Sequence, residues 1–314
     1  MPSNSSNTDK QTTGSHKQKT SAHWLVRSVV WVLGVSVAGA FAVLALIAIA
    51  LAVAFPNLPD ISDLSDYRPK LPLRVYSAEG DLMGEFGEER RNLTPIAEIP
   101  KVMTNAVLAI EDARFYQHGG VDYLGVIRAG LANVGKAKSQ GASTITMQVA
   151  RNVYLSSEKT FTRKIYEILF TFKLEHLLSK DQILEIYMNQ IFLGNRAYGF
   201  AAASEAYYGK NLKDITIAEA AMLAGLPKAP SAYNPINNPQ RARIRQRYII
   251  DRMLENGFIT AEEAESAKEQ ELKIKSGNGK DLVHGDYVAE MVRQLMYNQY
   301  GDETYTRGLD VRTT

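Results

Sequence analysis

Residues 106–118 read Ala-Val-Leu-Ala-Ile-Glu-Asp-Ala-Arg-Phe-Tyr-Gln-His, and this stretch decides how the rest of the chain is interpreted. Its first half, residues 106–110, is an apolar run, and we expect residues 111–118 to continue it as one amphipathic helix. At about 100° per residue, Glu111, Phe115 and His118 would then share one stripe. A carboxyl group beside an aromatic ring loses water and binds its proton more tightly. That environment suits a general base, whereas a solvated Glu-Asp pair would be only a surface feature.

Composition excludes several classes of protein. The chain has 314 residues and a net charge of +2, so nothing suggests a nucleic-acid-binding surface. It contains no cysteine, which excludes disulfides, thiolate nucleophiles and cysteine-ligated metals. The five histidines are scattered without zinc-site spacing, so we expect no transition-metal site.

The N-terminal part predicts a membrane anchor. Residues 1–28 are polar and are expected to form a disordered cytoplasmic tail, while residues 29–55 carry no charge. Such a run exceeds the roughly 20 residues that a transmembrane helix needs. The alternative is a signal peptide cleaved after Ala52-Val53-Ala54, but the apolar run is about twice as long as the usual 7–15 residues, which favours an uncleaved anchor. The side that stays cytoplasmic is indicated by the bases that precede the run, which are Lys10, Lys17, Lys19 and Arg27.

A mostly helical domain is expected over residues 73–275, after a Pro-rich linker over residues 56–72. Residues 73–77 and 82–86 flank a Glu-Gly-Asp turn and predict a β-hairpin. Ser179 and Gln182 predict a capping box for a helix that ends at Gly194. Further helices are expected at 217–225, 240–255, 261–270 and 286–300, and a mobile loop at 136–141. Residues 308–314 have the pattern of a final strand, which we expect to pair with the hairpin.

Further motifs carry the residue types that bind a phosphorylated sugar. Residues 141–148 (Gly-Ala-Ser-Thr-Ile-Thr-Met-Gln) combine hydroxyls with an amide, and Arg151-Asn152 follow. Residues 163–167 (Arg-Lys-Ile-Tyr-Glu) lie in a helix, where Arg163 and Glu167 could also form an ordinary i,i+4 ion pair. Apolar residues of the same helix, such as Ile165 and Phe172, would be core or would face a lipid interface. Residues 180–189 include Glu185 and Asn189, again four residues apart.

Taken in order, these motifs identify a family resemblance. Glu111-Asp-x-x-Phe-x-x-His118, Gly141-x-Ser-Thr-x-Thr-x-Gln148 and Arg163-Lys-x-x-Glu167 are followed by Lys180-x-x-Ile-Leu-Glu-x-Tyr-x-Asn189. Arg196-x-Tyr-Gly199 and Ala224-Gly-Leu-Pro-Lys-Ala-Pro230 complete the series. The chain resembles the peptidoglycan glycosyltransferase domain (glycosyltransferase family 51) of class A penicillin-binding proteins.

The resemblance implies a lysozyme-like, mostly α fold with a small membrane-proximal jaw subdomain. It implies that lipid II is polymerised into glycan strands, with inversion at the MurNAc carbon and release of undecaprenyl diphosphate. Glu111 would be the general base and Glu167 the second essential carboxylate, near the diphosphate or a divalent cation (Mg or Mn). The positions implied to bind substrate are Asp112, Phe115, His118, Ser143, Thr144, Gln148, Arg151, Asn152, Arg163, Lys164, Glu185 and Asn189. Met147 and Arg151 stand where the family usually has Gln and often has Lys.

The resemblance also implies location and partners. The protein would be a single-pass protein of the bacterial cytoplasmic membrane, with its catalytic domain outside and other wall-synthesis proteins as partners. Residues 276–314 would begin a linker toward a missing C-terminal transpeptidase domain. Ser156-Ser-Glu-Lys159 has the pattern of one transpeptidase motif, but it is a chance match, because the companion motifs of that domain are not present in this sequence. Two alternatives remain. One is a lysozyme-like enzyme that cleaves glycan, and the other is a non-catalytic membrane scaffold.

Overall fold

The computed structural model describes residues 19–54, 70–125, 143–154, 161–275 and 286–314. The chain divides into two compact units, residues 1–58 and residues 59–314. The stretches with a predicted character that lie outside the described residues are 1–18 of the tail, residue 55 of the apolar run, 56–69 of the linker, the loop 136–141, the match at 156–159, and 276–285 of the predicted C-terminal linker.

The first unit contains helix α1 (Lys19–Ala54). Its segment Val26–Leu46 is long and apolar enough to cross a membrane. The helix begins before the predicted boundary, so residues 19–28, which we expected in a disordered tail, are helical. No Gly or Pro lies between Lys19 and Val29, and extending an existing helix over such residues costs little free energy.

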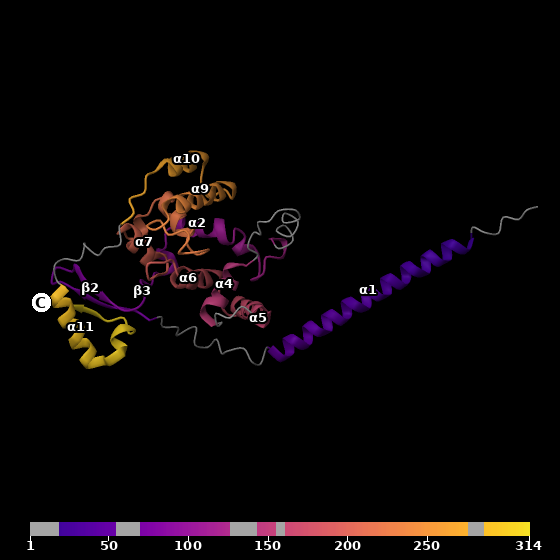
Figure 1. The fold of residues 1–314 in the computed structure, drawn as a ribbon, viewed down its shortest axis with the longest axis horizontal. Helices are drawn as coiled ribbons and strands as arrows, with labels where there is room; N and C mark the ends of the chain where they lie inside the picture. The colour runs from indigo at the N-terminus through magenta and orange to yellow at the C-terminus, as the bar shows by residue number, and fades with distance from the viewer. Residues whose placement is uncertain (1–18, 55–69, 126–142, 155–160, 276–285) are drawn as a thin grey trace, which may run out of the picture. The chain divides into compact units, whose positions relative to one another are not determined.

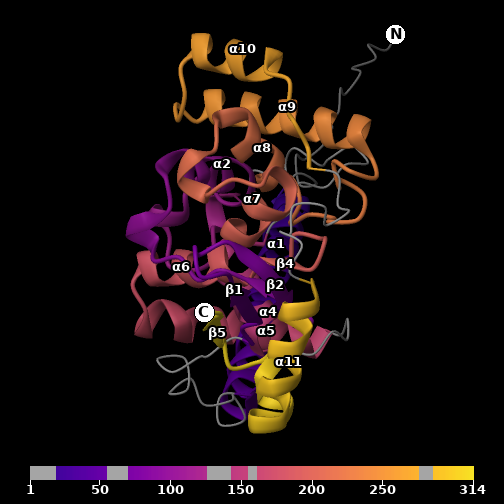
Figure 2. The same ribbon diagram turned by 90° about the vertical axis from the view of Figure 1, so that its left-hand side faces the viewer.

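The described part of the second unit is mostly helical, as predicted (Figures 1 and 2). Helix α2 packs against α8 and α9, while α4 packs against α5 and α6. The α-helices are α2 (Lys101–Glu111), α4 (Ile145–Tyr154), α5 (Phe161–Leu177), α6 (Lys180–Gln190), α7 (Phe200–Tyr208), α8 (Ile217–Ala224), α9 (Pro239–Glu255), α10 (Ala261–Glu269) and α11 (Asp286–Tyr300). Short 3₁₀ turns are η3 (Ile96–Glu98), η4 (Phe115–Gln117), η5 (Leu212–Asp214) and η6 (Gly301–Tyr305).

Capping fixes several helix starts. The predicted capping box of Ser179 and Gln182 is present at the start of α6, and α8 and α10 have the same device. The end of α6 differs from the prediction, because the helix stops at Gln190 and Gly194 lies outside it with a φ of 85°.

The predicted hairpin is confirmed, and it belongs to a small sheet. Strand β1 (Leu73–Tyr76) pairs antiparallel with β2 (Leu82–Phe86) and parallel with β5 (Asp310–Arg312), so the final strand pairs with the hairpin as expected. Helix α11 packs on this sheet and lies beside β2 in Figure 1. The core between them contains Leu73, Val75, Met83, Ala289 and Val292. Strands β3 (Arg90–Arg91) and β4 (Ala197–Tyr198) form a separate parallel pair.

The expectation that one helix continues through residues 111–118 is wrong. Helix α2 ends at Glu111, Asp112 leaves the helical conformation with a φ of −161°, and a 3₁₀ turn starts at Phe115. The physical reason is a set of tertiary contacts made by Asp112. The Asp112 carboxylate is engaged by α4 and by His118, and a continuous helix would not bring these partners together.

Candidate active site

Glu111 stands at the C-terminal end of α2, part-buried, with its carboxylate directed at α4. The Gln148 side chain donates a hydrogen bond from Nε2 to Glu111 Oε2 over 2.8 Å. Burial raises the pKa of Glu111 above its ordinary value, and the hydrogen bond from Gln148 opposes part of that rise. The two residues that the sequence placed in separate motifs are therefore in contact.

Three cations act on the same carboxylate. Arg245 of α9, Arg151 of α4 and Lys228 all lower the pKa of Glu111, but less than burial raises it. Arg151 was among the predicted site residues. Arg245 and Lys228 were not predicted as site residues, although Lys228 lies in the motif of residues 224–230 and Arg245 in the predicted helix 240–255. Only the packing of α9 on α2 reveals that Arg245 belongs here.

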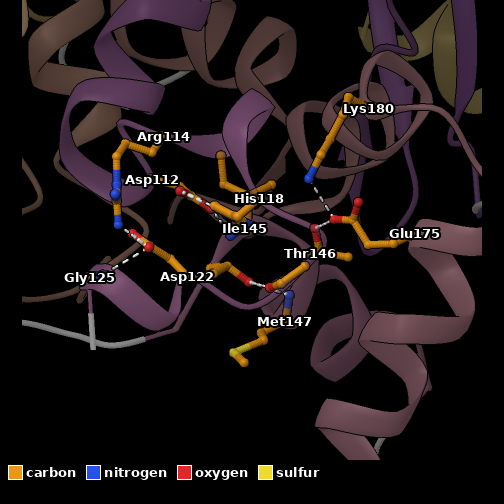
Figure 3. Close-up of polar contacts among 12 residues, drawn as sticks. Asp112, Arg114, His118, Asp122, Gly125, Ile145, Thr146, Met147, Glu175 and Lys180 are labelled. Carbon is orange, nitrogen blue, oxygen red and sulfur yellow. Dashed lines mark hydrogen bonds and ion pairs between the residues drawn. The ribbon is translucent and has the colours of Figure 1, made fainter. Parts of the chain in front are cut away.

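Asp112 connects the end of α2 to the start of α4. Its carboxylate lies 2.9 Å from His118 Nε2 and accepts a hydrogen bond from the backbone N–H of Ile145 over 3.2 Å. Figure 3 shows these three residues meeting at one point. Because Ile145 is the first residue of α4, the contact sets where the helix that carries Gln148 begins.

A second polar network lies nearby (Figure 3). Glu175 accepts hydrogen bonds from Thr146 Oγ1 over 2.5 Å and from Lys180 Nζ over 2.8 Å. The Lys180 ammonium also lies 4.4 Å from the centre of the buried Phe115 ring. Phe115 therefore takes part in this packing, and its predicted contact with substrate stays a prediction.

The predicted residues around the start of α4 differ in exposure. Thr144 is buried, donates from Oγ1 to the Gly120 carbonyl over 2.6 Å and accepts from the Met147 N–H, as a helix cap does. Met147 is itself buried, which fits an apolar side chain at this position. Ser143 and Arg151 are part-buried and Asn152 is exposed, so all three are accessible to a ligand.

Helix α5 carries the predicted Arg163, Lys164 and Glu167. Lys164 Nζ donates to Glu167 Oε1 over 2.6 Å, and Glu167 is almost fully buried while Lys164 is exposed. Among the described residues, no group of three His, Asp or Glu side chains is placed to hold a metal ion. Glu167 is one carboxylate already paired with an ammonium, so this donor set does not fit a divalent-cation site built by the protein.

Glu185 and Asn189 are engaged within the protein. The Glu185 carboxylate accepts from the Ile96 N–H over 2.7 Å, and the Asn189 amide exchanges two hydrogen bonds of 2.9 Å with the Thr94 backbone. They fasten the segment before α2 onto α6. Contact of either residue with substrate stays a prediction.

A cavity of about 520 Å³ lies away from these residues. It is formed by the hairpin and η6, with Lys70, Glu85, Arg196 and Asp302 among its lining. None of the predicted site residues lines it, so it is separate from the candidate site.

Comparison with known proteins places this geometry in a family. The family model described as Transglycosylase matches residues 79–254. Penicillin-binding protein 1A of Neisseria meningitidis serogroup B is 56% identical over 270 residues, which cover 86% of this chain and 34% of the relative. Penicillin-binding protein 1A of Escherichia coli K12 is 44% identical over 260 residues, which cover 82% of this chain and 31% of the relative.

A crystal structure of penicillin-binding protein 1A from Haemophilus influenzae aligns with 79% of this chain and 27% of its own. The TM-score is 0.45 and the sequence identity is 30%. The chain spans about a third of the length of the curated relatives it matches. Because the family model covers more than half of the residues, the chain belongs to the transglycosylase family.

Proposed function

We propose that this chain is a peptidoglycan glycosyltransferase that polymerises lipid II into glycan strands. Membership of the transglycosylase family supports the reaction class. The observation that carries the proposal is the contact between Glu111 and Gln148, because it fixes a desolvated carboxylate at the end of a helix. A carboxylate whose pKa is raised toward the working pH is a better proton acceptor than a solvated one.

The proposed chemistry is a single displacement. The Glu111 carboxylate accepts the proton of the acceptor GlcNAc 4-hydroxyl, and the oxygen bonds to the anomeric carbon of the donor MurNAc. The bond from that carbon to the lipid diphosphate breaks, and undecaprenyl diphosphate leaves with the electron pair. Attack opposite to the leaving group inverts the configuration from α to β.

The diphosphate gains negative charge as it leaves, so cations fixed near it would stabilise the transition state. Arg151, Arg163 and Lys164 are the residues we assign to this task, and the pairing of Lys164 with Glu167 would hold the lysine in place. Ser143, Thr144, Gln148 and Asn152 would line the donor side of the cleft. A divalent cation beside Glu167 would need oxygens of the donor diphosphate as further ligands, because Glu167 is a single carboxylate, and no step is assigned to it.

Location and organisation belong to the same proposal. Helix α1 would anchor the protein in the bacterial cytoplasmic membrane, with its N-terminus cytoplasmic. The exposed side chains of Ile165 and Phe172 on α5 support contact with a lipid interface. Residues 73–275 would form the catalytic domain, and residues 276–314 would lead toward a transpeptidase domain, since the relatives are longer.

The test is a pair of assays on the full chain in detergent. Elongation of labelled lipid II together with failure to clear cell-wall sacculi is the expected result, because synthesis rather than hydrolysis is proposed. Clearing of sacculi without elongation would favour the glycan-cleaving alternative. Neither activity in a folded protein would favour the scaffold.

A further inference from the structure

Tyr187 is a buried tyrosine of α6 whose hydroxyl is isolated. Its side chain is 1% exposed. Among the described residues, no atom lies within hydrogen-bonding distance and geometry of its Oη. Burying a hydroxyl without a partner is energetically costly, so native proteins rarely keep one without a reason.

The position of Tyr187 supplies a reason. Helix α6 packs against α4, which carries Gln148 and Arg151. Burial raises the pKa of Tyr187 well above its ordinary value, so the phenol keeps its proton and remains a donor. The Glu111 carboxylate adds to that rise and the Arg151 guanidinium opposes it.

Glu111 has room for a second donor. Gln148 bonds to Oε2, and no hydrogen bond to Oε1 of Glu111 is found among the described residues. Hydrogen bonds of catalytic groups are often unmade in a free enzyme and form only when substrate is bound. We infer that Tyr187 is a positioning residue, whose hydroxyl donates to the Glu111 carboxylate in the substrate complex. This inference rests on the proposed function.

The contrast with Tyr207 provides a matched control. Tyr207 is equally buried, on α7, but its hydroxyl donates to the Leu193 carbonyl over 2.9 Å. Both tyrosines become phenylalanine by loss of one oxygen. Tyr207→Phe breaks a hydrogen bond that serves structure, whereas Tyr187→Phe removes a hydroxyl that has no structural partner among the described residues.

The pH dependence of Glu111 is set by several groups besides Tyr187. Helix α8 also packs on α2, and its one charged residue, Glu219, pairs with Lys210. Asp112 is the neighbour of Glu111 in the chain and pairs with His118. The cations that act on Glu111 from the surrounding elements are Arg151, Lys228 and Arg245. None of these groups changes in either variant, so a shift of the Glu111 pKa reports on the altered tyrosine.

The experiment measures lipid II polymerisation against pH, with thermal unfolding, for the wild type, Tyr187→Phe and Tyr207→Phe. For Tyr187→Phe we expect an unchanged or higher Tm and kcat lowered about tenfold, as for loss of one hydrogen bond to a charged group. The acid limb of the pH–rate profile, where Glu111 becomes protonated, should move to higher pH. The shift should be larger in kcat than in kcat/KM, because the hydrogen bond from Tyr187 to Glu111 forms in the substrate complex. Tyr207→Phe should lower Tm and leave both limbs in place.

Two results would overturn the inference. A fully active Tyr187→Phe with unshifted limbs, beside an active wild type, would show that the hydroxyl has no part in the reaction. A shift of the same size in Tyr207→Phe would show that the effect is general loosening. Failure of the folded wild type to form strands would instead overturn the proposed function, and the role of Tyr187 with it.

Discussion

Among single residues, the candidate site depends most on Glu111, a carboxylate that the fold makes difficult to ionise. Burial raises the pKa of Glu111, while Gln148 and three cations partly oppose that rise. An acid with a raised folded-state pKa favours the folded state below its unfolded pKa, and that contribution is lost as the pH rises through the folded value. Ionised Glu111 therefore lowers stability at neutral pH, and the protein retains it for another reason.

The hydrogen bond from Gln148 can be tested at this scale. In Gln148→Leu, the donor that lowers the pKa of Glu111 is gone, so the pKa should rise further. We expect the acid limb of kcat/KM for lipid II polymerisation to move to higher pH. The control is Gln246→Leu, because Gln246 is also buried but donates to the Ala218 carbonyl. It should lower Tm without moving the limb, and an unshifted limb in Gln148→Leu would contradict the assigned contact.

At the scale of elements, the sequence predicted correctly those features that depend on residues close together in the chain. The Ser179–Gln182 cap, the 73–86 hairpin and the helix of residues 286–300 are all present. The predicted end of the Glu111 helix was wrong because Asp112 is bound by Ile145, which lies far along the chain. Packing between distant elements also explains why the influence of Arg245 on the pKa of Glu111, and of Glu111 on the pKa of Tyr187, was missed. Periodicity along a sequence carries no information about which helices pack together.

The cap of α6 gives a prediction at the same scale. In Ser179→Ala the Gln182 N–H loses its acceptor, and the free energy of unfolding should fall by about 1 kcal/mol. Ser179→Asp keeps an acceptor at the cap and should lose much less. Chemical denaturation of the two variants beside the wild type measures this difference. Equal losses would show that the cap is not what stabilises the start of α6.

At the scale of the whole molecule, segments far apart in the chain are tied to the helices of the site. Strand β5 pairs with β1, and Arg74 of β1 donates to the Arg91 carbonyl over 2.7 Å. The Arg91 guanidinium in turn donates to Gln190 Oε1 over 2.7 Å, at the end of α6. The helix that carries Tyr187 is therefore connected to the small sheet on which α11 packs.

The packing of α11 on that sheet gives a prediction for the whole molecule. Ala289 is 1% exposed in the core with Leu73 and Val75, whereas Tyr287 on the same helix is 82% exposed. Ala289→Asp would bury a charge without a partner and should lower Tm clearly. Tyr287→Asp should change the free energy of unfolding by no more than about 0.5 kcal/mol. If both variants kept the wild-type Tm, α11 would not be part of the folded unit.

The assignment of Glu111 as the base is tested by polymerisation of labelled lipid II by the full chain, with wild type and Glu111→Gln measured side by side. The change is nearly isosteric and removes the ionisable group, so the variant should remain folded, with a Tm at neutral pH no lower than that of the wild type. We predict that the wild type forms glycan strands and that the folded variant forms none. Strand formation by Glu111→Gln at the wild-type rate would contradict the assignment of Glu111 as the base.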